Sequence, residues 1–127
     1  MRTKLLSIFP LLLFISQISY AQVNPKDVTI IRDNYGVPHI YGKTDADMVY
    51  GLAWAACEDN FMVMQENFLA VKGRLARIKG KEGAIMDVLA HVTQAEDQAE
   101  VIHQSNPYSP AFKIILKAYV QALNDYV

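Results

Sequence analysis

Few side chains in this sequence are candidates for chemistry. Cys57 is a possible nucleophile, but the sequence places neither a glycine-rich elbow nor a histidine beside it, so we interpret it as a small buried residue. His39, His91 and His103 are possible metal ligands. No two of them share an i, i+4 spacing, and no recognised ligand set is complete. We predict ordinary structural or surface histidines, with His39 partly buried and hydrogen-bonded.

Asp59 is the carboxylate with the most informative position. It lies seven residues after Leu52, which returns it to nearly the same side of a predicted helix. A carboxylate on a packed face must be paired or take up a proton. It could act as a catalytic acid, or it could cap a neighbouring helix or pair with Arg74 or Arg77. We favour the structural role, because paired buried acids usually serve architecture.

A basic run near the middle of the chain has two interpretations. It could receive a phosphate or a substrate carboxylate, or it could be a solvated helix face that offsets Glu66 and Glu82. The second is simpler, since the sequence holds no P-loop, GxSxG or HExxH motif. Residue chemistry alone therefore defines no reaction. The run consists of Lys72, Arg74, Arg77, Lys79 and Lys81.

A β-hairpin is predicted at the start of the folded part. Residues 28–32 are rich in β-branched side chains and predict a strand, and residues 33–36 (DNYG) predict a turn. Residues 37–41 then return as a second strand. Pro38 cannot donate to a ladder, so this strand should lie at an edge or carry a bulge.

Helices are predicted for most of the rest. Thr44 and Asp47 form a capping box before a helical pattern that runs to about residue 78, with apolar positions at Met48, Leu52, Ala55 and Val63 and a break or bend at Gly73.

The second half of the chain continues the helical pattern. Residues 79–83 predict a turn and residues 84–92 a further helix, whereas residues 93–104 could be helix or loop. Ser109 and Pro110 predict the start of an amphipathic helix that reaches Val127.

Residues 1–21 predict a cleavable secretion signal. Arg2 and Lys4 precede an apolar stretch, and a small-residue site ends at Ala21. An uncleaved anchor is the alternative, but the stretch is short for a span of about 20 residues. The chain has 13 acidic and 12 basic residues, and two of the basic residues lie in this leader. Nucleic acid and anionic membranes are therefore not expected partners. One cysteine excludes an internal disulfide.

Four sequence blocks, in this order, resemble the penicillin acylase (penicillin amidase) family. The first resembles its opening hairpin, the second its first helix, the third the close of a helical pair and the fourth its "AYxxGxNxY" helix, although Ala122 stands where glycine is usual. The third block and the Asp59–Asn60 step lean toward the branch of acyl-homoserine-lactone and aculeacin acylases. The blocks are residues 31–40 (IRDNYGVPHI), 47–60 (DMVYGLAWAACEDN), 68–80 (FLAVKGRLARIKG) and 118–126 (AYVQALNDY).

This resemblance implies an N-terminal-nucleophile hydrolase with a four-layer αββα core. Such enzymes are made as precursors that cleave themselves, and the new first serine of the β chain uses its own α-amine as base. The fold class expected is therefore α+β: a hairpin and several helices from the N-terminal part of that core. Residues 1–21 would be the signal peptide, and residues 22–127 an incomplete domain, the start of the α chain.

The resemblance places no catalytic, cofactor or metal residue in this chain. The nucleophile would lie beyond Val127, and calcium is possible only in the full-length fold. The expected partners are the rest of the same precursor and a small N-acyl amide, in the periplasm or secreted, with no membrane contact after signal cleavage. The alternative is an exported, non-catalytic helical remnant or binding module. Matching residues taken as scaffold are Asp33, Gly36, Pro38, His39, Gly51, Asp59, Gly73 and Asn124.

Overall fold

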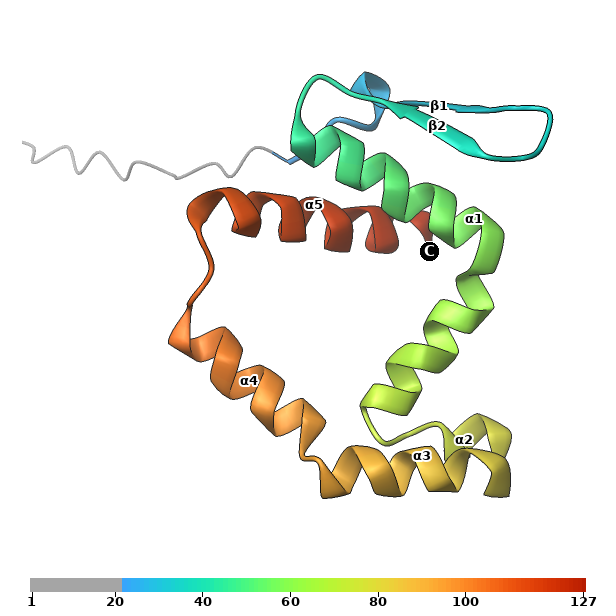
Figure 1. Cartoon of the computed structure of the whole chain (residues 1–127), viewed down its shortest axis with the longest axis vertical. Coiled ribbons are helices and arrows are strands. Elements are labelled where there is room, and N and C mark those ends of the chain that lie inside the picture. The colour runs from blue at the N-terminus through green and yellow to red at the C-terminus, as the bar shows by residue number, and fades with distance from the viewer. Residues whose placement is uncertain (1–21) are drawn as a thin grey trace, which may run out of the picture.

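The computed structural model of the chain describes residues 22–127, so the predicted leader lies outside the described part. Figure 1 shows a hairpin and the first half of a long helix lying over the last helix, with the other helices extending away. No helix in residues 22–127 is long and apolar enough to cross a membrane. The elements are η1 (Pro25–Asp27), β1 (Thr29–Arg32), β2 (Pro38–Tyr41), α1 (Asp45–Val71), α2 (Ala76–Lys79), α3 (Lys81–Val92), α4 (Ala95–Ser105) and α5 (Pro110–Tyr126).

The predicted hairpin is confirmed. β1 and β2 pair antiparallel, with Thr29 opposite Tyr41 and Arg32 opposite Pro38. Pro38 thus ends the ladder of a two-stranded sheet, where its missing N–H costs no internal bond. In the turn, the Gly36 amide donates to the Asp33 carbonyl at 3.0 Å.

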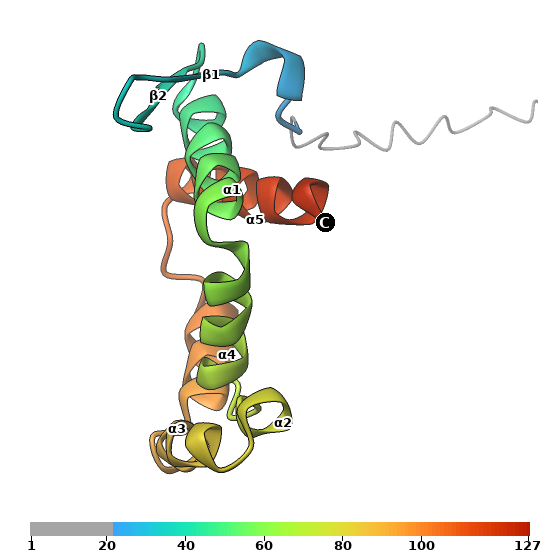
Figure 2. The same cartoon turned by 90° about the vertical axis from the view of Figure 1, so that its right-hand side faces the viewer.

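α1 begins at the predicted capping box. The Thr44 hydroxyl accepts from the Asp47 amide at 3.2 Å, and the Asp47 carboxylate accepts from the amides of Thr44 and Lys43 at 2.9 and 3.1 Å. These bonds satisfy donors that the first turn of a helix leaves unpaired. The helix kinks at Asn60, whose φ of −147° and ψ of 36° are non-helical. Figure 2 shows α1 changing direction partway along its length.

The helical pattern predicted to continue to about residue 78, with a break at Gly73, is confirmed, because α1 ends at Val71 and α2 covers Ala76–Lys79. Gly73 has a φ of +62°, and a Cβ built on it would lie 2.8 Å from Nε2 of His91. Both facts favour glycine and make position 73 a break.

The turn is shorter than the predicted residues 79–83, since Lys81 already belongs to α3. Only Gly80, with a φ of +60°, separates α2 from α3. The Asp87 carboxylate accepts from the amides of Leu75 and Ala76 at 2.7 and 2.9 Å, so α3 supplies the missing cap of α2.

The last two helices resolve one open alternative and confirm one prediction. The segment left open as helix or loop contains α4, which begins after Gln94 in the left-handed conformation. α5 begins at the predicted cap, where the Ser109 hydroxyl accepts from the Phe112 amide at 3.2 Å and Pro110 occupies the first turn.

The core lies where α5 packs against the first half of α1. It is built on small residues, since Ala53 and Ala122 are 0% exposed. Leu52 and Val63, two of the apolar positions named at helical spacing, are more than half exposed, so that spacing does not mark the buried face. Small side chains let helix backbones approach closely, and they therefore take the contact positions here. The core cluster is Val23, Tyr50, Ala53, Ala118 and Ala122.

Gly51 is the point of closest approach between α1 and the hairpin. A Cβ at this position would lie 2.5 Å from Cγ2 of Ile40 and 2.9 Å from Cγ1 of Val28. We expect Gly51→Ala to lower the free energy of unfolding by about 1–2 kcal/mol, because overpacking outweighs the gain in helix propensity. Urea denaturation measures it.

The double variant Gly51→Ala/Ile40→Ala identifies the cause. Removing the Ile40 side chain relieves the main clash, so the added methyl should cost much less in that background. A Gly51→Ala single variant that is more stable than the wild type contradicts the close-packing account.

Candidate functional site

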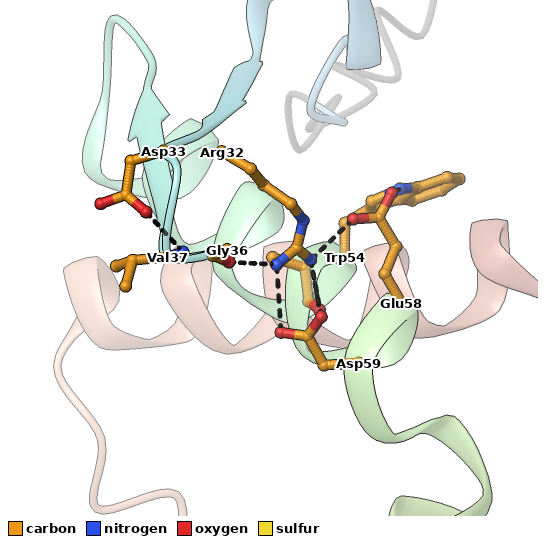
Figure 3. Close-up of polar contacts among 8 residues, drawn as sticks. Arg32, Asp33, Gly36, Val37, Trp54, Glu58 and Asp59 are labelled. Atoms are coloured by element: carbon orange, nitrogen blue, oxygen red, sulfur yellow. Dashed lines mark hydrogen bonds and ion pairs between the residues drawn. The ribbon is translucent and has the colours of Figure 1, made fainter.

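The site with the densest polar contacts joins the hairpin to α1 through Arg32 (Figure 3). Nη1 of Arg32 donates to the Gly36 carbonyl at 2.8 Å, and Nη2 donates to the Ala55 carbonyl at 3.4 Å. Nη2 also lies 3.0 Å from Oε2 of Glu58 and 2.9 Å from Oδ1 of Asp59. One guanidinium thus ties the turn of the hairpin to the end of the first half of α1.

One positive guanidinium faces two carboxylates at this junction. The hydrogen bonds from Glu58 and Asp59 raise the pKa of Arg32 further above its usual range. Glu58 is itself held by Trp54, whose Nε1 donates to Oε1 at 3.1 Å. A guanidinium that never gives up its proton cannot act as acid or base, so the chemistry of this junction is that of a structural clamp.

The structure places Asp59 differently from the sequence-based prediction. Its side chain is 46% exposed and its partner is Arg32, and its structural role stays a prediction. Arg74, one predicted partner, lies 3.9 Å from Glu96 instead. Arg32 and Glu58 were not singled out from the sequence. The only available signal was that a basic residue ends a strand beside a helix carrying two adjacent acids.

The hairpin turn holds a second polar cluster, around Asp33. Its Oδ1 accepts from the amides of Tyr35 and Val37 at 2.8 and 3.0 Å, and its Oδ2 lies 3.2 Å from Nε2 of His39. The His39 contact and these amide bonds lower the pKa of Asp33. His39 is hydrogen-bonded as predicted, but its side chain is 51% exposed, so the prediction of partial burial is wrong.

The remaining candidate residues do not converge on one place. Cys57 is buried, and burial raises the pKa of its thiol, which disfavours the reactive thiolate. From the basic run, Lys79 pairs with Glu66 at 2.6 Å, as expected of a solvated helix face. Within residues 22–127 no group of three His, Cys, Asp or Glu side chains could hold a metal ion.

A pocket at the other side of α1 involves residues that sequence reasoning missed. The Gln121 amide bonds both backbone groups of Val23 at 2.9 Å, and Oδ2 of Asp125 accepts from the Tyr50 hydroxyl at 3.0 Å. The i, i+4 spacing of Gln121 and Asp125 on an amphipathic helix was the available signal. Burial and the Asp125 hydrogen bond raise the pKa of Tyr50 to about 12.

Taken together, the hairpin, the clamp and the helices define a mostly helical α+β scaffold segment. Residues 27–127 match the sequence model of the family described as Penicillin amidase, and the chain therefore belongs to the penicillin amidase family. The family resemblance stated from the four sequence blocks is confirmed.

Known relatives share this segment. Penicillin G acylase of Escherichia coli is 25% identical over 107 residues, which cover 84% of this chain and 12% of that protein. Acyl-homoserine lactone acylase PvdQ of Pseudomonas putida is 33% identical over 69 residues, which cover 53% of this chain and 9% of that protein. The chain therefore spans about a tenth of the length of these relatives.

A solved structure confirms the fold class. The thermostable penicillin G acylase from Alcaligenes faecalis superposes with a TM-score of 0.62 at 22% identity, over 78% of this chain and 52% of that chain. The α+β fragment predicted from the resemblance, a β-hairpin with several helices, is the fold observed.

We expect Arg32→Ala to lower the melting temperature by more than Lys43→Ala. Arg32 loses bonds to two carbonyls and two carboxylates, whereas Lys43 loses one exposed pair with Asp27. Arg32→Lys should fall between the wild type and Arg32→Ala, because an ammonium cannot reproduce the fork. Calorimetry of the three variants gives the order. Asp59→Asn should cause a smaller loss, and an unchanged value would contradict its structural role.

We expect the hairpin turn to loosen in acid because of Asp33. Its folded-state pKa lies below the unfolded value, so its contribution is present above about pH 4 and is lost as the pH falls through the lower folded value. The protection factors of the Tyr35 and Val37 amides, which are the exchange rates of an unstructured peptide at the same pH divided by those of the protein, should fall between pH 6 and about pH 3 when followed by NMR. Asp33→Asn should abolish most of this pH dependence, whereas Asp45→Asn should leave it intact.

Proposed function

We propose that this chain is the N-terminal part of the α chain of an exported amidohydrolase precursor. The whole enzyme would hydrolyse the side-chain amide of an N-acyl compound to a carboxylic acid and an amine. One observation carries the proposal: the family match runs through residues 27–127, yet the chain spans only 9–12% of relatives that are acylases. The nucleophile would then lie beyond Val127.

The described residues would contribute scaffold to that reaction. The Arg32 clamp fixes the hairpin to α1, and the capping bonds at Thr44 and Asp87 fix the ends of α1 and α2. The family resemblance implies that the nucleophile is a new N-terminal serine. Its α-amine titrates near pH 8, so it can accept the proton of its own hydroxyl, directly or through a water.

Exposed apolar side chains support a large partner surface. On α3 and α4, Ile85, Val92 and Val101 are each about two thirds exposed or more. Such side chains normally find cover in a folded protein. We assign this cover to the remaining α chain and the β chain of the same precursor, since the matched segments make up only 9–12% of the relatives.

Export completes the proposal. The leader of residues 1–21 would direct the precursor across the inner membrane, and the processed enzyme would mature in the periplasm or be secreted. Nucleic acid is not an expected partner, given the slight acidic excess.

The activity test compares the full-length precursor with its first segment. We expect the full-length precursor to hydrolyse a phenylacetyl amide or a long-chain acyl-homoserine lactone, and residues 22–127 alone to release no acid from either. Amine release, followed by a fluorogenic label, measures both. Amidase activity of residues 22–127 alone would refute a downstream nucleophile.

The same assay addresses the acyl group. Preference for long acyl chains over phenylacetyl would support the acyl-homoserine-lactone branch, and the reverse preference would support the penicillin G branch. A reading frame that stops at codon 128 and yields an inactive protein would favour the non-catalytic remnant instead.

A further inference from the structure

The segment after the proposed leader is held in a groove between α1 and α5. Val23 is only 7% exposed and belongs to the core cluster. Its amide donates to Oε1 of Gln121 at 2.9 Å, and its carbonyl accepts from Nε2 of Gln121 at 2.9 Å. This pair of bonds satisfies both backbone groups of Val23 and fixes the direction of the chain at Gln22.

A carboxylate lies beside this fixed segment. Oδ2 of Asp125 accepts from the Tyr50 hydroxyl at 3.0 Å and from Nε2 of Gln121 at 3.2 Å. Both donors are neutral groups, so neither cancels the negative charge of Asp125. The raised pKa of Tyr50, about 12, keeps its hydroxyl protonated and donating at neutral pH.

Gln22 and Asp125 line the same pocket. Its volume is about 680 Å³, and the rings of Tyr50 and Trp54 form part of its wall, with centroids 6.2 Å apart. Gln22 and Asp125 also both line an adjoining pocket of about 470 Å³. A carboxylate beside aromatic faces is the chemistry that binds an ammonium ion.

We propose that this pocket binds a primary ammonium group, namely the α-ammonium that Gln22 acquires when the leader is removed after Ala21. Water hydrolyses the Ala21–Gln22 peptide bond, which leaves a carboxylate on Ala21 and an amine on Gln22 that takes up a proton below about pH 8. Before that cut the same nitrogen is a neutral amide. The inference rests on the leader removal that belongs to the proposed function.

Tethering favours this occupant over a free amine. Consecutive Cα atoms lie about 3.8 Å apart. Because Gln121 fixes the backbone of Val23, the new ammonium of Gln22 is held near the Asp125 carboxylate at a high effective concentration. The ion pair would therefore form only in processed chains, and it would mark the mature N-terminus as docked. Other charged or titratable groups lining the pockets around Gln22 are Lys117 on α5, His103 on α4, Asp27, and Lys43, Asp45 and Asp47 near the start of α1.

The test uses the full-length precursor, exported from a bacterial host and purified after processing. Mass spectrometry of the N-terminal peptide identifies the first residue. Reductive methylation with ¹³C-formaldehyde then labels the lysines and the α-amines of both chains, and the NMR shift of the signal assigned to Gln22 is followed against pH. We expect an α-amine pKa raised by about 0.5 unit or more above that of a methylated peptide of the same sequence.

Matched variants assign the shift. Asp125→Asn keeps an acceptor for Tyr50 and Gln121 but loses the charge, so the α-amine pKa should return to the peptide value. Asp97→Asn, in a different pocket on α4, should leave the raised pKa unchanged.

Three results would overturn the inference. They are a chain that begins at another residue, a Gln22 that has cyclised with loss of ammonia, and a wild-type α-amine that titrates like the peptide. The titration of the wild-type α-amine is informative even where a variant fails to fold. Amide hydrolysis measured on the same preparation before methylation separates the two proposals, since an active enzyme with an ordinary Gln22 α-amine pKa refutes only this one.

Discussion

The close approach of three backbones along the first half of α1 is the constraint on which the described structure depends. Gly51 admits the hairpin on one side, and Ala53 meets Ala122 of α5 on another. Larger side chains at these positions would push the elements apart and remove the contacts that surround them. The Arg32 clamp can form only because the hairpin already lies against α1.

Stability in this segment therefore comes from close contact between backbones more than from the burial of large side chains. The fully buried side chains are small, with Cys57 the largest among them, while many large apolar side chains stay exposed. A fold of this kind is specific in how its elements meet but buries little apolar area itself. That division agrees with the proposal that later parts of a longer precursor supply the cover.

Features that depend on neighbouring residues were predicted from the sequence, whereas contacts between distant residues were not. The caps at Thr44 and Ser109 and the break at Gly73 each depend on a few neighbouring residues, and all three were found from the sequence. The partner of Asp59 lies 27 residues away in Arg32, and no local pattern distinguishes it from Arg74. The exposed face of α1 was misjudged for the same reason, because helical spacing identifies a stripe but not the element that covers it.

The kink at Asn60 has a geometric consequence for the other helices. Beyond it, α1 leads through α3 and α4 back to α5, which packs on the first half of α1, so the path closes on itself (Figure 1). A closed path fixes its last corner once its sides and other corners are set, as in a ring of bonded atoms. One residue added within α3 would advance the chain by about 1.5 Å and rotate the downstream residues by about 100°. Every corner of the loop, including Asn60, would then have to readjust together.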